Sequence, residues 1–232
     1  MNQNFKEQFF LILAAIFISS LVACNLIFQK FFSWNPGDLY LFEISVGILP
    51  YPITFLATDL ISELYGRKKA NQVVLAGFIA SIFVVAIVVI GQKVSATAWS
   101  PVNDETFGLV FGLSGPAVFA SMSAYLLAQL IDVRLFHFWK KLTKGKHLWL
   151  RNNGSTVVSQ LVNTMTVLLL LCATGVIPWD KFGALLENGF LFKVIVALID
   201  TPIIYAILYL LKDKIKPISH EAEPNSGLSE SP

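Results

Sequence analysis

The sequence is poor in charged residues and in the side chains that hold metals. Only 14% of its 232 residues are charged, whereas 55% are hydrophobic, which is far from the balance of a soluble domain. The two cysteines and three histidines lack metal-ligand spacing, so we expect no metal and no other cofactor. Nucleophile-elbow, zinc-protease and phosphate-loop motifs are also missing. These absences argue against an enzyme and favour a membrane protein.

Long apolar stretches fill most of the chain. Six of them are long enough to cross a bilayer as helices, at a rise of about 1.5 Å per residue. They cover residues 9–28, 40–60, 73–91, 116–138, 155–176 and 190–211. The sequence therefore predicts an all-α integral membrane protein, with one six-span domain over residues 1–216.

Two parts of the chain depart from this apolar pattern. Pro50 and Pro52 lie inside the second stretch, and each removes a backbone donor. We therefore expect the helix over 40–60 to be kinked or broken there, either at a transport site or as a packing kink. Residues 217–232 are polar and predict a disordered cytoplasmic tail.

The 17 lysines and arginines are distributed unevenly over the two sides of such a six-span protein. Thirteen of them lie on the side of the two termini. The other four are Lys30, Lys93 and Lys181 on the opposite side, and Lys193 inside a span. Because cytoplasmic loops carry the excess of Lys and Arg, we expect both termini in the cytoplasm. The net charge of +2 is then a topology signal, and we expect no nucleic-acid partner.

Two charges lie inside the last apolar stretch. Lys193 and Asp200 are seven residues apart, so they share a helix face but are separated by roughly 10 Å, too far to pair. Each costs on the order of 2.5–3.5 kcal/mol at the centre of a membrane. Each therefore requires a partner on another helix, water in a cavity, or a ligand.

Other polar and aromatic side chains occur at membrane depth in the remaining stretches. They are Asn25, Glu43, Tyr51, Phe55, Asp59, Gln129, Asp132, Gln160 and Asn163. Single amides at such places usually form hydrogen bonds between helices. The three acidic residues among them and Asp200 are harder to explain in that way, and together with Lys193 they predict a polar site within the membrane.

Four segments resemble the queuosine precursor transporter family, which is also described as a vitamin-uptake group. They are FLATDLISELYGRKKA at 55–70, AYLLAQLIDVRLFHFWKK at 124–141, STVVSQLVNT at 155–164 and FKVIVALIDTPIIY at 192–205. The elements A-T-D-L-x-x-E-x-Y-G, Q-x-x-D, Q-x-x-[DN]-T and F-K occur in this order. Their combination is what makes the resemblance specific, and it extends from the first span to the sixth.

The resemblance implies import of 7-cyano-7-deazaguanine or 7-aminomethyl-7-deazaguanine, precursors of the modified tRNA base queuosine. Such a base offers N1–H and an amino group to carboxylates, and O6 to a lysine or an amide. Asp200, Asp132 and Glu43 are candidates for the first role, and Lys193 or Asn25 for the second. Gln129, Gln160, Asn163 and Asp59 complete the expected lining, and Tyr51 and Phe55 are candidates for stacking.

One position departs from the family. Many relatives are expected to carry an aspartate where this chain has Asn163, and the neutral amide puts an ion-coupling role there in doubt.

Some alternatives stay open at the level of the sequence. A substrate-binding membrane subunit of an energy-coupling-factor vitamin importer has the same size and span count, but it requires a partner module. Intramembrane carboxylates suit proton coupling and hydrogen bonding to a neutral base equally well. The preferred precursor and a homo-oligomeric state are likewise open.

Overall fold

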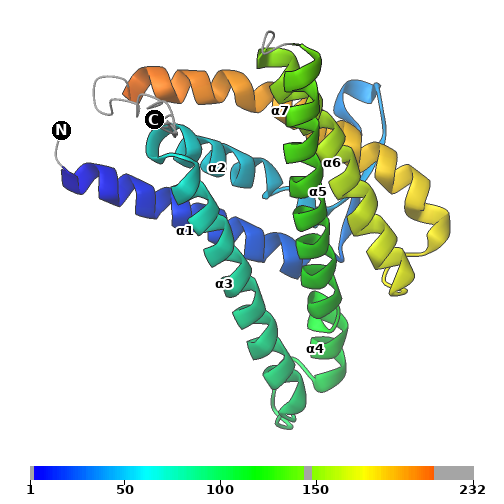
Figure 1. Ribbon diagram of the computed structural model, residues 1–232. Coiled ribbons are helices and arrows are strands. Elements are labelled where there is room, and N and C mark those ends of the chain that lie inside the picture. The colour runs from blue at the N-terminus through cyan, green and yellow to red at the C-terminus, as the bar shows by residue number, and fades with distance from the viewer. Residues whose placement is uncertain (1–2, 144–147, 212–232) are drawn as a thin grey trace, which may run out of the picture.

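The computed structural model describes residues 3–143 and 148–211 (Figure 1). These residues form seven α-helices, a two-stranded hairpin and three short 3-10 helices. The α-helices are α1 (Gln3–Ile27), α2 (Tyr51–Tyr65), α3 (Arg67–Lys93), α4 (Asp104–Phe111), α5 (Ser114–Leu142), α6 (Leu148–Ala173) and α7 (Phe182–Leu211). The strands are β1 (Phe31–Trp34) and β2 (Phe42–Ser45). The 3-10 helices are η1 (Pro36–Asp38), η2 (Val46–Ile48) and η3 (Trp179–Lys181). The tail expected to be disordered, 217–232, lies outside the described residues.

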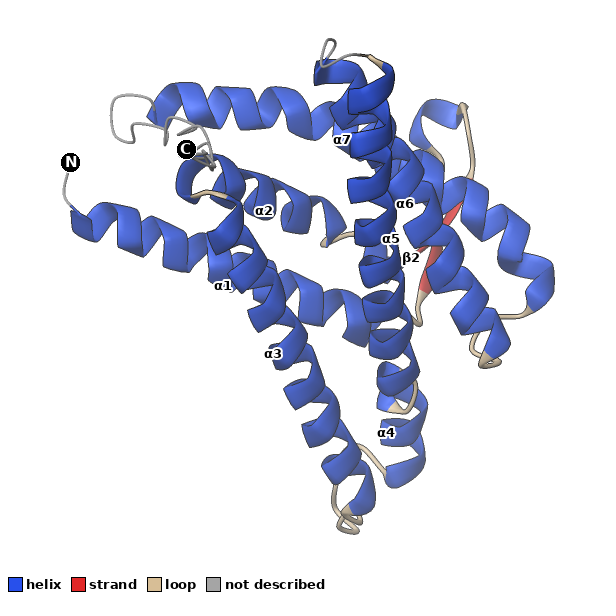
Figure 2. Cartoon of the chain, in the orientation of Figure 1, coloured by secondary structure: helices blue, strands red, loops and turns tan. Residues whose placement is uncertain are grey.

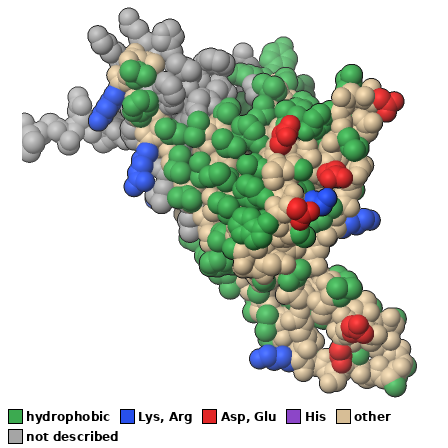
Figure 3. Space-filling model, turned by 90° about the vertical axis from the view of Figure 1, so that its right-hand side faces the viewer, with side chains coloured by type: hydrophobic (Ala, Val, Ile, Leu, Met, Phe, Trp, Pro, Cys, Tyr) green, Lys and Arg blue, Asp and Glu red, His purple; other side chains and the backbone are tan. Residues whose placement is uncertain are grey.

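The chain is a multi-pass membrane protein. Among the described residues, four helical stretches are long and apolar enough to cross a bilayer: Asn4–Ile27, Lys68–Lys93, Asp104–Tyr125 and Trp179–Leu210. The apolar part of α6, Val157–Ala173, is shorter. The count of six spans is therefore not confirmed. Hydrophobic side chains cover a broad area of the surface (Figure 3), as expected where lipid tails replace water.

The predicted helix over 40–60 is wrong in its first half. Instead of entering a helix at residue 40, the chain forms an antiparallel hairpin in which Phe31 pairs with Ser45 and Trp34 with Phe42 (Figure 2). Gly37 and Asp38, in the turn between the strands, have φ values of 61° and 55°, a left-handed conformation that breaks a helix.

The proline pair begins α2 and does not kink a continuous span. Pro50 caps the helix and Pro52 occupies its first turn. A helix lacks acceptors for its first backbone N–H groups in any case, so proline removes nothing there. Tyr51 is consequently the first residue of a helix, placed where the backbone enters the bundle.

Two apolar clusters mark the two ends of the bundle. In one, the beginning of α1 packs against α2, the beginning of α3 and the last turns of α7, through residues such as Leu13, Ile61, Val73 and Ile207. In the other, Phe28 at the end of α1 packs against α5, α6 and the beginning of α7. On α1 and α7, which contribute to both clusters, polar side chains such as Asn25 and Lys193 lie in the sequence between them.

The hairpin joins these elements at one end of the bundle. Gly47 lies so close to α1 that a Cβ on it would be 2.6 Å from the carbonyl oxygen of Cys24. On the opposite side, the Tyr40 hydroxyl donates to Glu187 (3.2 Å) and Asn188 (2.8 Å) at the beginning of α7. The hairpin thereby fixes where α2 begins relative to α1 and α7.

Candidate functional site

Tyr51 links α2 to α6 through its hydroxyl group. The hydroxyl donates to Oε1 of Gln160 at 2.9 Å and accepts from Nδ2 of Asn163 at 3.1 Å. Gln160 and Asn163 are three residues apart on α6 and therefore face the same way. The phenol and both amides are half-buried, so each hydrogen bond satisfies groups that water reaches poorly.

Lys193 brings a positive charge from α7 to the same place. Its Nζ lies 4.5 Å from the centroid of the Tyr51 ring, a cation–π contact that stabilises a desolvated ammonium by up to about 2 kcal/mol. The Phe55 ring meets Tyr51 edge-on, with centroids 4.5 Å apart and an interplanar angle of 80°. Tyr51, Phe55, Gln160, Asn163 and Lys193 form one group, which we call the Tyr51 cluster.

Cys24 is a residue that the sequence did not single out for the site. It lies on α1 within electrostatic range of both Lys193 and Tyr51. No cysteine motif marks it, because its proximity depends on how the hairpin returns the chain from α1 to α2.

Asp59 and Asp200 meet at a different level of the bundle. Asp200 on α7 is only 8% exposed, and its Oδ2 has no hydrogen-bond partner in the described part of the chain. Asp59 on α2 is exposed and lies within electrostatic range of both Asp200 and Glu63. Eight residues separate Asp59 from Tyr51, which is about 12 Å along the helix.

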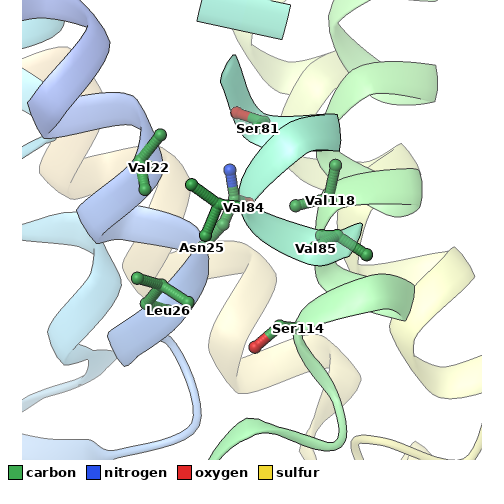
Figure 4. Close-up of a pocket in the computed structure, with 8 residues that line it drawn as sticks. All are labelled: Val22, Asn25, Leu26, Ser81, Val84, Val85, Ser114 and Val118. Carbon is green, nitrogen blue, oxygen red and sulfur yellow. The ribbon is translucent and has the colours of Figure 1, made fainter. Parts of the chain in front are cut away.

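Asn25 belongs to a separate polar contact between α1 and α5. Its Oδ1 accepts from the Ser121 hydroxyl at 3.0 Å, and its Nδ2 donates to the carbonyl of Leu21 at 3.0 Å. It lines a pocket of about 10 Å³ between α1, α3 and α5, together with Ser81 and Ser114 (Figure 4). A volume of this size holds about one water molecule, so this pocket is a packing defect beside a structural hydrogen bond.

The remaining predicted residues are not placed in the Tyr51 cluster. The side chain of Glu43 is exposed on β2, on the face opposite the buried Phe42 and Ile44. Its backbone carbonyl accepts a 3.3 Å bond from Nδ2 of Asn188. Gln129 and Asp132 lie on α5, but their side chains are outside the part of the structure that is described.

The contacts of Tyr40 with Glu187 and Asn188 were also not expected from the sequence. Desolvation and the adjacent Glu187 carboxylate raise the pKa of Tyr40 above its usual value near 10, so the phenol stays a neutral donor at physiological pH. The signal that was available is the turn sequence Asn35-Pro36-Gly37-Asp38 between two aromatic runs, which is typical of a hairpin.

Comparisons with known proteins find similar sequences among transporters. Residues 45–207 match a family model described as "Putative vitamin uptake transporter". The chain is 29% identical over 170 residues to a "Probable queuosine precursor transporter" of Bacillus subtilis, covering 73% of each chain. It is 24% identical over 230 residues to the "Queuosine precursor transporter" of Escherichia coli, covering 97% of this chain and 96% of the relative.

No solved structure matches the chain significantly. The family assignment therefore depends on the sequence matches, and the match over 45–207 spans α2 to α7. The chain belongs to the vitamin uptake transporter family, in which the similar curated proteins carry the name queuosine precursor transporter.

Proposed function

We propose that this protein imports queuosine precursors, 7-cyano-7-deazaguanine or 7-aminomethyl-7-deazaguanine, across a bacterial inner membrane with both termini in the cytoplasm. The names of the relatives support the substrate class. The observation that carries the proposal is the Tyr51 cluster, in which three helices bring a cation, two amides and two aromatic rings together. It acts as a carrier and not as an enzyme.

The atoms of the cluster match the edges of a deazaguanine. Asn163 uses its Nδ2 on Tyr51, which leaves its Oδ1 to accept from the N1–H or the amino group of the base. Gln160 uses its Oε1 on Tyr51, which leaves its Nε2 to donate. Lys193 would donate to O6, exchanging its contact with the Tyr51 ring for a charge-assisted hydrogen bond of about 1.5–3 kcal/mol.

Such a set of donors and acceptors discriminates between bases. A ring that lacks the 2-amino group or O6 would leave Asn163 or Lys193 without a partner in a poorly hydrated site, which costs about 1–3 kcal/mol for each group. The aromatic wall of Tyr51 and Phe55 contributes stacking that any flat ring would receive. Hydrogen bonding therefore supplies the selectivity, and stacking supplies affinity that does not distinguish one flat base from another.

The proposal is tested by uptake of a radiolabelled precursor in cells that lack both its synthesis and their own importer. Expression of this chain should confer uptake that unlabelled precursor inhibits and that adenine does not. Asn163→Ala and Gln160→Ala should each reduce uptake at least fivefold. Gln72→Ala, which alters an exposed amide on α3, is the matched control and should leave it unchanged. Well-expressed protein without uptake would refute the substrate assignment.

A further inference from the structure

The carboxyl group of Asp200 is the polar group that the Tyr51 cluster leaves unexplained. It is buried on α7, and its Oδ2 has no hydrogen-bond partner in the described residues. An ionised carboxylate in this situation is far costlier than a neutral carboxyl. The burial of Asp200 therefore favours its protonated, neutral form, and its charge appears when the proton leaves.

A second and a third carboxyl group connect Asp200 to the surface. Asp59 is within electrostatic range of Asp200 across the contact between α2 and α7, and Glu63 is within range of Asp59. Asp59 and Glu63 are four residues apart, so they lie on the same face of α2. Both are exposed, whereas Asp200 is buried. The three groups thus form a row that runs from the end of α2 into the bundle.

The direction of this row follows from the packing of the helices. Tyr51 contacts Lys193, and Asp59 lies within electrostatic range of Asp200. Helices α2 and α7 therefore run parallel, with intervals of eight and seven residues between the two levels. Glu63 lies toward the end of the bundle where α1 begins, because the Tyr65 hydroxyl donates to the carbonyl of Lys6 at 2.8 Å. That end carries Lys68 and Lys69, the side proposed above to be cytoplasmic.

One backbone hydrogen bond of α7 is missing beside Asp200. Pro202 lies inside the helix and provides no N–H to the carbonyl of Leu198, four residues earlier. The helix can bend at such a point with little loss of hydrogen bonding. Asp200 therefore lies where α7 can move relative to α2, which is what a group that alternately gains and loses a proton requires.

We propose that Asp200 carries the proton that couples import to the pH gradient, and that Asp59 and Glu63 form its release path to the cytoplasm. The Asp200 carboxyl transfers its proton to the Asp59 carboxylate and becomes a carboxylate. Asp59 passes the proton to the Glu63 carboxylate, and Glu63 passes it to water. Asp200 regains a proton from the outer side in the next cycle. This inference rests on the proposed transport function and assigns the acidic row a role distinct from holding the base.

The charged surroundings of Asp200 are simple in the described part of the chain. Asp59 and then Glu63 face this region from α2, and Lys193 lies two turns away on α7 itself. Residues 157–173 of α6 include no charged side chain, whereas the side chains of 148–156, Arg151 among them, lie outside the described part. The charged residues of α1, Lys6 and Glu7, lie at its beginning. Among the described side chains, no cation forms an ion pair with Asp200.

The test is transport by the full-length chain in liposomes with an imposed pH gradient and radiolabelled 7-aminomethyl-7-deazaguanine. Wild type should concentrate the label when the outside is acidic and lose this ability when an ionophore removes the gradient. Asp200→Asn should abolish concentration while still exchanging internal unlabelled for external labelled precursor. Asp59→Asn should slow gradient-driven uptake about tenfold, and Glu105→Gln, an exposed carboxylate on α4, should behave as wild type.

Each other outcome is decisive. Concentration of label by Asp200→Asn under the pH gradient would overturn the proposal, as would a wild type that exchanges label but responds only to a sodium gradient. If Asp200→Asn folds poorly, Asp59→Asn decides, since unchanged gradient-driven uptake in that variant contradicts the release path. A wild type that neither exchanges nor concentrates label would refute the transport function itself, which is a different failure.

Discussion

At the scale of single residues, the Tyr51 hydroxyl organises the candidate site. It is at once a donor to Gln160 and an acceptor from Asn163, so it fixes which atoms of the two amides point away from it. A hydroxyl is the smallest group that can do both. We infer that Tyr51 matters more through this orientation than through its ring surface.

Tyr51→Phe tests this orientation. The variant keeps the ring beneath Lys193 but removes the bridge, which costs roughly 1 kcal/mol, or about a fivefold rise in the apparent KM for uptake. Tyr205→Phe is the control, since Tyr205 is 71% exposed on α7. Equal uptake kinetics for Tyr51→Phe and wild type would show that the hydroxyl is incidental.

Lys193→Met separates function from stability. The half-buried ammonium has lost much of its hydration, and an unbranched apolar side chain of similar length removes that cost. We expect uptake to fall at least about tenfold while the Tm in detergent stays equal or rises, because the charge serves the ligand and not the fold. Lys181→Met, at an exposed position, should change neither. A large fall in Tm with intact uptake would assign Lys193 a structural role.

The residue types of the site were predictable, but their grouping was not. The aromatic pair Tyr51 and Phe55 and the amide pair Gln160 and Asn163 follow from spacing on a helix. That Tyr51 bonds both amides depends on α2 beginning at residue 51, which a continuous span over 40–60 would not provide. Asn25 has the structural role that single membrane amides usually have.

At the scale of elements, the β1–β2 hairpin is the feature that sets the position of α2. The prediction of a helix over 40–60 is wrong in its first half, because membrane helices and the hairpins that pack against them are both rich in apolar residues. The left-handed backbone at Gly37 and Asp38 is a local turn signal that overrides it. The other five expected spans each overlap a helix, because long apolar runs leave the backbone no other way to satisfy its hydrogen bonds.

Gly47→Ala tests the seating of the hairpin on α1. An added Cβ would lie 2.6 Å from the carbonyl oxygen of Cys24 and 2.9 Å from Cα of Phe28, and neither backbone atom can move freely. We expect a loss of about 1–3 kcal/mol in stability, measured as a Tm lower by several degrees. Gly108→Ala is the control: its Cβ would meet no atom within 4 Å, and alanine favours a helix by up to about 1 kcal/mol. A Gly47 variant as stable as the Gly108 variant would contradict the close packing.

At the scale of the whole molecule, polar groups lie between an apolar cluster at each end of the bundle. The Tyr51 cluster and the acidic row occupy successive levels of α2 and α7. Movement of α7 against α2 would affect both a ligand held at the first level and a proton held at the second. This separation allows binding and energy coupling to be removed independently by mutation.

The proposed orientation of the chain is tested by labelling single cysteines. Single cysteines replacing Leu39 in the hairpin turn and Trp99 in the loop after α3, which are 89% and 82% exposed, should react with a membrane-impermeant maleimide on intact spheroplasts. A cysteine replacing Lys68 should react only after lysis. Both native cysteines are replaced by serine in these variants. Labelling of position 68 on intact spheroplasts would reverse the proposed topology.

Transport by the purified chain alone tests the central claim most directly. Reconstituted in liposomes without any partner, it should take up radiolabelled 7-aminomethyl-7-deazaguanine saturably, and Lys193→Met should not. Binding of the label without transport until an ATP-driven module is added would identify the chain as the substrate-binding subunit of an energy-coupling-factor importer. If folded protein neither binds nor transports the label, the assignment of a deazaguanine to the Tyr51 cluster is contradicted.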